Sequence, residues 1–267
     1  EMFRKDRADF ESKWNDMKII IEYGMLTEDK FFEKAKKFAM YADTDGGLHT
    51  FEAYLESIKE HQTDKDKKTV VLYASNKDAQ HSYIQNAKAK GYSVLLLDSP
   101  LTSHLLQKLE QEHENTTFAR VDSDLIDNLI KKDETRVAKL SDKQKEELKT
   151  RLETIVPTEK FTLKLEDMDS TEAPLVITVP EFMRRMKEMQ MTGGGGMMGM
   201  GDFPDMYDLI VNANHPLASK ILDTEDAEAR SSAVNQALDL AKLQQNLLHG
   251  EELTAFIARS YEMLGNE

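Results

Sequence analysis

The chain has 267 residues, no cysteine and a formal net charge of −14. This length usually exceeds one small core, so we expect two domains or a domain with subdomains. The acidic balance argues against nucleic acid as the main partner and against an anionic membrane surface. Without cysteine the chain has no disulfides, no thiolate chemistry and no cysteine-based zinc site. No apolar run approaches the length of a membrane span, and together these features fit a reducing cytoplasm.

The first part of the chain has a helical pattern. Over residues 1–62, apolar side chains recur at three- and four-residue steps, which predicts three helices. Gly24 is expected to end the first of them, and Thr27 and Thr50 are expected to cap the next two. Residues 43–47 are expected to form a loop between helices.

The pattern then changes to alternating strands and helices. Residues 69–74 and 92–97 are apolar runs of strand length, and a helical pattern follows each of them. Such runs predict parallel strands covered by helices on both faces, in a small three-layer βαβα subdomain over residues 67–133. The charged stretch near residues 131–134 predicts a boundary, which gives a first domain of residues 1–133.

Residues 134–267 predict a second, α+β domain. Strands are expected at residues 161–165, 175–179 and 207–211. A long helix should begin near Asp223 and end at Gly250, and a last helix should end at Gly265. The fold class is therefore α+β with an α/β subdomain, closing with a helical hairpin.

Seven of the 14 methionines fall between Met183 and Met200. On a helical wheel Phe182, Met186 and Met189 share one side with Met183 at its edge, and charged residues fill the other side. The usual fate of such a stripe is to face a core. Methionine side chains, however, are flexible and do not define a single packing arrangement in a core. They recur on surfaces that bind varied apolar partners. Both interpretations stay open at this point, and the glycine-rich residues 193–201 that follow favour the exposed one.

The long helix near the C-terminus carries two apolar stripes. One stripe consists of Val234, Ala237, Leu238 and Ala241, and the other of Leu240, Leu243 and Leu247. A helix with two apolar sides is buried on two sides. It either runs through the middle of its own domain or meets a symmetric copy in a four-helix bundle.

Motifs for catalysis are largely missing. The sequence has no nucleophile elbow, no Walker loop and no His-Glu-x-x-His pair. Ser75 follows a strand and opens a helix, where it could hold phosphate but is more often a helix cap. The loop with Asp43, Asp45 and Gly46 resembles a calcium loop, yet Tyr41 stands where the first carboxylate belongs, so an ordinary loop is favoured.

Several segments together resemble the heat-shock protein 90 family, in particular its bacterial branch. The matching segments, in chain order, are residues 48–54, 59–62, 71–75, 90–98, 214–217 and 236–241. Their order and spacing extend over nearly the whole chain. No single segment is diagnostic, and the combination carries the resemblance.

The resemblance implies that this chain is the end of a middle domain followed by a C-terminal dimerisation domain. The start at Glu1 within a charged helical pattern also predicts part of a longer protein. The nucleotide-binding domain would then be missing. This fragment is expected to hold no cofactor and to be no enzyme, whereas the full-length protein would bind ATP with Mg²⁺ and hydrolyse it.

The resemblance further implies two kinds of site. Client proteins, which are partly unfolded chains, would bind to Phe182, Met183, Met186 and Met189, with a second patch at Ser103, His104 and Gln107. Homodimerisation would use the last two helices, through Leu240, Leu243, Leu247, Leu253, Phe256, Ile257 and Leu264. The alternative function is a small-ligand-binding or enzymatic module at the strand ends near Ser75 and Asp98.

Overall fold

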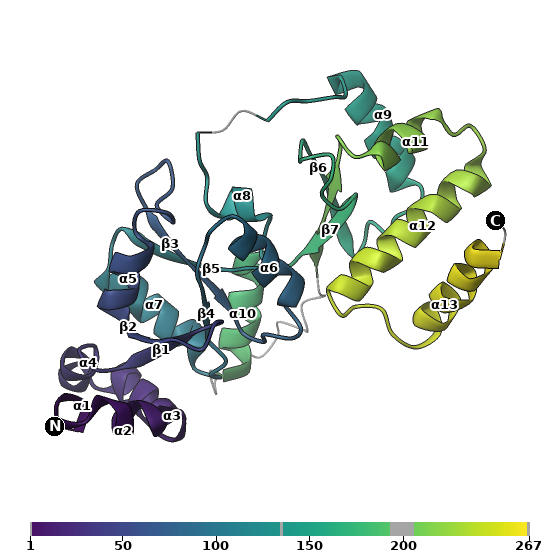
Figure 1. Cartoon of the computed structure of the whole chain (residues 1–267). Coiled ribbons are helices and arrows are strands. Elements are labelled where there is room, and N and C mark those ends of the chain that lie inside the picture. The colour runs from purple at the N-terminus through teal and green to yellow at the C-terminus, as the bar shows by residue number, and fades with distance from the viewer. Residues whose placement is uncertain (1, 134–135, 193–205, 266–267) are drawn as a thin grey trace. The chain divides into compact units, whose positions relative to one another are not determined.

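The computed structural model describes residues 2–133, 136–192 and 206–265 (Figure 1). The chain divides into two compact units, Glu1–Asp133 with Glu181–Gly201 and Glu134–Pro180 with Asp202–Glu267. The helix of residues 181–192 groups with the first unit. Each unit has its own sheet and its own apolar core, in agreement with the expected mixture of α+β and α/β structure.

Short helices open the first unit: α1 (Met2–Lys5), α2 (Arg7–Ser12), α3 (Trp14–Thr27) and α4 (Asp29–Ala35). The Phe10 ring holds them together, with ring centroids 5.4 Å from Phe3 and 5.8 Å from Trp14. The prediction that Gly24 ends a helix was wrong, because α3 continues to Thr27. A Cβ at Gly24 would lie 2.9 Å from the Phe31 ring, so this glycine allows α4 to approach α3 closely.

The sheet of the first unit has the strand order β2-β1-β4-β3-β5. An antiparallel hairpin of β1 (Met40–Asp43) and β2 (Leu48–Thr50) forms its edge, where the sequence analysis expected only helices and a loop. Strands this short carry too few residues for a period of two to emerge. The turn is closed by Asp43, whose Oδ1 accepts the N–H groups of Asp45 and Gly47 at 2.8 Å each.

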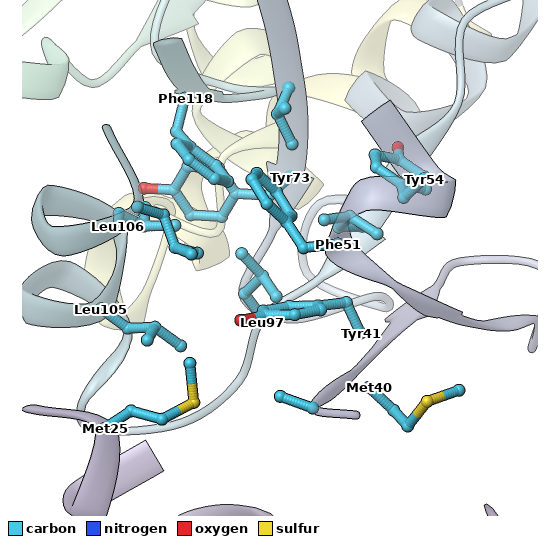
Figure 2. Close-up of a cluster of buried hydrophobic side chains, with 14 of the residues drawn as sticks. Met25, Met40, Tyr41, Phe51, Tyr54, Tyr73, Leu97, Leu105, Leu106 and Phe118 are labelled. Atoms are coloured by element: carbon cyan, nitrogen blue, oxygen red, sulfur yellow. The ribbon is translucent and has the colours of Figure 1, made fainter. Parts of the chain in front are cut away.

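The remaining strands are β3 (Thr69–Ala74), β4 (Val94–Leu96) and β5 (Thr116–Arg120), which are parallel to one another with β3 between the other two. The apolar runs predicted β3 and β4, whereas β5 was not predicted. The helices of this part are α5 (Phe51–Ile58), α6 (His81–Ala89), α7 (Thr102–Glu112) and α8 (Ile126–Leu129). Figure 2 shows the core, to which Phe51 of α5 and Phe118 of β5 contribute stacked rings with centroids 5.6 Å apart.

The second unit has a sheet of order β6-β8-β7. Its strands are β6 (Phe161–Glu166), β7 (Leu175–Thr178) and β8 (Tyr207–Asn212), with β8 parallel to β6 and antiparallel to β7. The core combines these strands with α9 (Asp142–Glu153), α11 (Pro216–Asp223) and α12 (Ala227–Gln244). The last helix is α13 (Gly250–Gly265).

The long helix α12 is shorter than the sequence predicted. It begins after Asp226, whose carboxylate accepts the N–H groups of Glu228 and Ala229, and it ends at Gln244. The expected end at Gly250 was wrong. Gly250, with φ of +56°, is instead the first residue of α13.

None of the helices in the described ranges combines the length and the apolar character needed to cross a bilayer.

Helix α11 begins at a histidine cap whose strength should depend on pH. His215 Nδ1 accepts the N–H of Leu217 at 3.0 Å, and burial lowers the pKa of His215 from its ordinary value of 6.5. As the pH falls below 6.5, the unfolded chain takes up the proton first, so the free energy of unfolding falls until the lower folded pKa is passed. Protonation also removes the accepting nitrogen.

We therefore expect the His215→Asn variant to lose less stability than the parent between pH 7.5 and 5.5, because asparagine caps without titrating. The difference should stay below about 1 kcal/mol, the usual value of a whole cap, because the ring is partly exposed to solvent. Urea unfolding of both proteins at both pH values measures it. Equal losses in parent and variant would show that this cap does not titrate.

Candidate functional site

The methionine-rich segment forms α10 (Glu181–Thr192), which lies among the elements of the first unit (Figure 1). Its contacts are with α7 and with the parallel strands. Pro180 precedes the helix, and Glu181 provides the negative charge that the first turn favours. The side chains of residues 189–192 and the whole of residues 193–205 lie outside the described part of the chain.

The charged side of α10 faces inward. Arg184 is only 7% exposed, and its Nη1 donates to Glu188 Oε1 at 2.5 Å. Its Nη2 donates to Glu181 Oε1 at 2.6 Å and also to the Tyr73 hydroxyl. The guanidinium group lies over the Tyr73 ring. The Tyr73 hydroxyl in turn donates to Glu181 Oε1 at 3.0 Å.

Arg185 joins the same helix to α7 and β5. Its Nε donates to Glu181 at 2.6 Å, between residues one helical turn apart. Its Nη1 donates to Glu110 Oε2 of α7 at 2.9 Å, and its Nη2 donates to the carbonyl of Phe118 in β5 at 2.9 Å. Glu110 also accepts the N–H of Phe118, so α7, β5 and α10 meet at one carboxylate. We call the contacts of Glu181, Arg184, Arg185 and Glu188 the arginine seam.

The electrostatics of the arginine seam keep its groups ionised. Burial alone would raise the pKa of Glu181, but Arg184, Arg185 and the N–H of Arg120 outweigh it and hold the pKa below its ordinary value. Burial raises the pKa of the Tyr73 hydroxyl, which therefore stays protonated and able to donate. Buried ion pairs add little net stability, but removing one partner costs about 3–5 kcal/mol because a buried charge is left behind.

The apolar side of α10 faces away from the arginine seam. Phe182 is 71% exposed and Met186 is 37% exposed, whereas Met183 is half-buried. The Met189 side chain is outside the described residues. Of the two interpretations of the methionine stripe, the exposed one holds for Phe182 and Met186 in this chain.

The second expected patch lies on α7, beside α10. Ser103 is buried, and its hydroxyl donates to Glu188, so it belongs to the contact with α10 and is no part of an open surface. Gln107 is exposed and His104 half-buried, with no hydrogen-bond partner for His104 Nδ1 within the described ranges. These two side chains border a shallow hollow of about 380 Å³, also lined by Leu26, Asp29, Lys108 and Gln111.

The residues expected at the dimer interface divide into two groups. Leu240, Ile257 and Leu264 are 53%, 44% and 75% exposed, and Leu243 is also exposed. Leu247, Leu253 and Phe256 are half-buried. The other stripe of α12, at Val234, Ala237, Leu238 and Ala241, is buried in its own unit.

Polar contacts hold α13 to α12. Arg259 donates to Gln236 Oε1 at 2.8 Å and to Asp239 Oδ2 at 2.6 Å, and Gln236 donates to the Ser260 hydroxyl. No residue of α13 in its described length is buried. The apolar side of this hairpin is therefore left open within one chain.

The strand ends near Ser75 and Asp98 do not form an open ligand site. The Oε1 atom of buried Gln80 accepts the N–H groups of Ser75 and Asn76 at 2.8 and 3.0 Å, where a phosphate would have to bind. Asp98 pairs with Lys18 at 2.5 Å. The Asp43 carboxylate is likewise used, since its Oδ2 lies 2.7 Å from His49 Nε2. Within the ranges that the structure describes, no group of three or more acidic, histidine or cysteine side chains could hold a metal ion.

The residues that hold α10 in place were not identified from the sequence. The helical wheel placed the charged residues opposite Phe182 and Met186 and left open which side is covered, because a wheel shows only which residues share a side. A signal was present in the spacing of Glu181, Arg184, Arg185 and Glu188, which alternates charges at three- and four-residue steps. The partners Tyr73 and Glu110 carry no such signal.

Comparisons with known proteins agree with the resemblance. A family model described as Hsp90 protein matches residues 1–265. A chaperone protein htpG of Bacteroides fragilis (strain 638R) is 37% identical over 98% of this chain and 48% of its own length. A chaperone protein HtpG of Porphyromonas gingivalis (strain ATCC 33277) is 41% identical over 91% of this chain and 36% of its own length. The chain thus spans at most about half the length of these relatives.

The role of Gln80 can be tested by removing its acceptor. Gln80→Met fills a similar volume but leaves the N–H groups of Ser75 and Asn76 without a partner, so it should cost about 1–3 kcal/mol of unfolding free energy. Gln80→Glu keeps the accepting oxygens and should cost less. Urea unfolding compares the two variants, and a larger loss in Gln80→Glu would contradict this role. Micromolar binding of inorganic phosphate to the parent, by calorimetry, would favour the small-ligand alternative.

Proposed function

We propose that this chain, which belongs to the heat-shock protein 90 family, is the part of a molecular chaperone that binds partly unfolded client proteins and pairs with a second copy. The observation that carries the proposal is the orientation of α10, which buries its charged side and leaves Phe182 and Met186 exposed. Exposure of these apolar side chains to water does not stabilise the fold of a single chain. A surface that binds apolar segments of many sequences needs such adaptable side chains.

The nucleotide chemistry of the proposed full-length chaperone belongs elsewhere in that protein. In support, the N–H groups of Ser75 and Asn76 at the end of β3, where a phosphate could bind, already donate to Gln80. We accordingly propose that this chain holds clients without hydrolysing ATP, and that hydrolysis in the full-length protein acts on it through the middle domain.

The proposed homodimer would use the open side of the α12–α13 hairpin. Leu240, Ile257 and Leu264 are exposed although apolar, and polar side chains such as Arg259 make the hydrogen bonds between α13 and α12. Burying each such leucine or isoleucine against a second hairpin would contribute about 1.5–3 kcal/mol. Several residues on each copy could thus outweigh the free energy that association costs.

Client binding is tested by making the exposed side of α10 polar. The double variant Phe182→Ser, Met186→Ser should bind a permanently unfolded protein, such as reduced and carboxymethylated lactalbumin, at least about tenfold more weakly, because each lost apolar contact contributes more than about 1.4 kcal/mol. Fluorescence anisotropy of the labelled client measures the affinity.

A matched control changes Ile20→Ser, Tyr23→Ser on α3. These side chains are 72% and 61% exposed, so they test whether any exposed apolar pair has the same effect. If the α3 variant lost as much affinity as the α10 variant, client binding would be non-specific and α10 would not be the site.

Dimerisation is tested with charges on the open side of the hairpin. Leu240→Asp, Ile257→Asp should convert a dimer into monomers, since burying two unpaired carboxylates per chain opposes association. Sedimentation velocity measures the mass of the parent, this variant and the control Ile20→Asp, which should remain dimeric. A dimeric variant would place the interface elsewhere, and a monomeric parent would remove this part of the proposal.

A further inference from the structure

We infer that Arg184 and Arg185 are positioning residues, which hold α10 in a single register so that its apolar side and the exposed part of α7 form one binding surface for an apolar polypeptide segment. The inference rests on the proposed client binding and adds to it. It assigns a role to two charged residues that do not contact the client.

The arginine seam permits only one register. Glu181 accepts from the Tyr73 hydroxyl of β3 and from the N–H of Arg120 in β5, so two strands fix its position along the sheet. Arg184 and Arg185 of its own helix hold the carboxylate in that orientation. A shift of α10 by one turn moves it about 5.4 Å along its axis. Arg185 would then lose Glu110 and the carbonyl of Phe118. Glu181 would lose the Tyr73 hydroxyl and the N–H of Arg120. Leaving partly buried charges without these partners is far more costly than a misplaced apolar contact.

The planar guanidinium group is suited to this task. Arg185 spans from Glu181 in its own helix to Glu110 in α7 and the carbonyl of Phe118 in β5. Such forked, charge-assisted contacts are directional, whereas thioether side chains pack in many arrangements. Docking α10 through its methionines would leave its position loosely defined.

The same contacts bring the two expected client patches together. Ser103 bonds to Glu188, and Glu110 bonds to Arg185, so both ends of one side of α7 meet α10. Gln107 is four residues after Ser103 and three before Glu110, which places it on that same side of α7, between the two contacts. It is nevertheless exposed, so it stands at the edge of α10 and not beneath it. An apolar segment bound along α10 would therefore reach Gln107 as well.

The experiment removes the contact with α7 and leaves the apolar side of α10 unchanged. Arg185→Ala should speed hydrogen exchange of the α10 amides, because undocked helices open more readily. If docking falls to about one molecule in ten, the apparent Kd for reduced, carboxymethylated lactalbumin rises about tenfold. The control is Lys34→Ala, which removes an exposed cation of α4 and should alter neither quantity.

Covalent rescue separates positioning from a general loss of structure. The chain has no cysteine, so Ser103→Cys with Glu188→Cys introduces the only thiol pair, at positions whose side chains touch. Joined by a short bifunctional thiol reagent in the Arg185→Ala background, this pair should restore client affinity to within about twofold of the tethered parent, since docking is again complete. The same variant without the thiol reagent should bind the client weakly.

The outcomes distinguish this inference from the proposed function. Faster exchange in Arg185→Ala with unchanged client affinity would overturn the positioning role, and so would weak binding that the tether fails to restore. Unchanged exchange in Arg185→Ala would overturn the role of the seam itself. If the parent binds no client, or Phe182→Ser, Met186→Ser binds as the parent does, the proposed function fails, whereas the exchange result still reports on docking.

Discussion

Inward-facing arginine–carboxylate pairs are the interaction on which the exposed apolar surfaces of this chain depend. An amphipathic helix usually attaches by burying its apolar stripe. Helix α10 attaches through Arg184 to the Tyr73 hydroxyl and through Arg185 to Glu110. Helix α13 attaches through Arg259 to Asp239 and Gln236. In both helices the guanidinium forks supply the contact with the rest of the unit. Phe182 and Ile257 then remain outside because the inner side of their helix is already occupied.

This arrangement separates the surfaces from the cores. The apolar clusters of the two units are built from the sheets and their covering helices, and none of the described residues of α10 or α13 belongs to either cluster. Most of the burial that stabilises each unit is therefore independent of the exposed side chains. The binding surfaces can change in sequence without loss of the fold, provided that the arginines keep their partners. Tyr73 is the exception, because its ring lies in the core and its hydroxyl reaches the arginine seam.

The sequence predicted those parts of the fold that local patterns determine. The apolar runs at residues 69–74 and 207–211 became strands, and the two stripes of α12 proved to be one buried and one open side. The β1–β2 hairpin was missed because its strands are too short to display a period. The orientation of α10 was not predictable from its own residues, because it depends on Glu110 and Tyr73, which are distant in sequence. A periodic pattern identifies the two sides of a helix, and only the tertiary partners decide which side is covered.

The arginine seam also explains how adaptable side chains can be exposed on a helix whose backbone is fixed. Arg184 and Arg185 hold the pKa of Glu181 below its ordinary value, so this carboxylate stays ionised at neutral pH. Because the groups of the seam are largely buried, salt screens them less than it screens exposed pairs. The helix backbone is thus fixed under conditions that weaken ordinary surface ion pairs. Under the proposed function, adaptation to different clients comes from the rotatable bonds of methionine. Since the backbone is already ordered, binding need not order it again, and each weak apolar contact contributes more to the affinity.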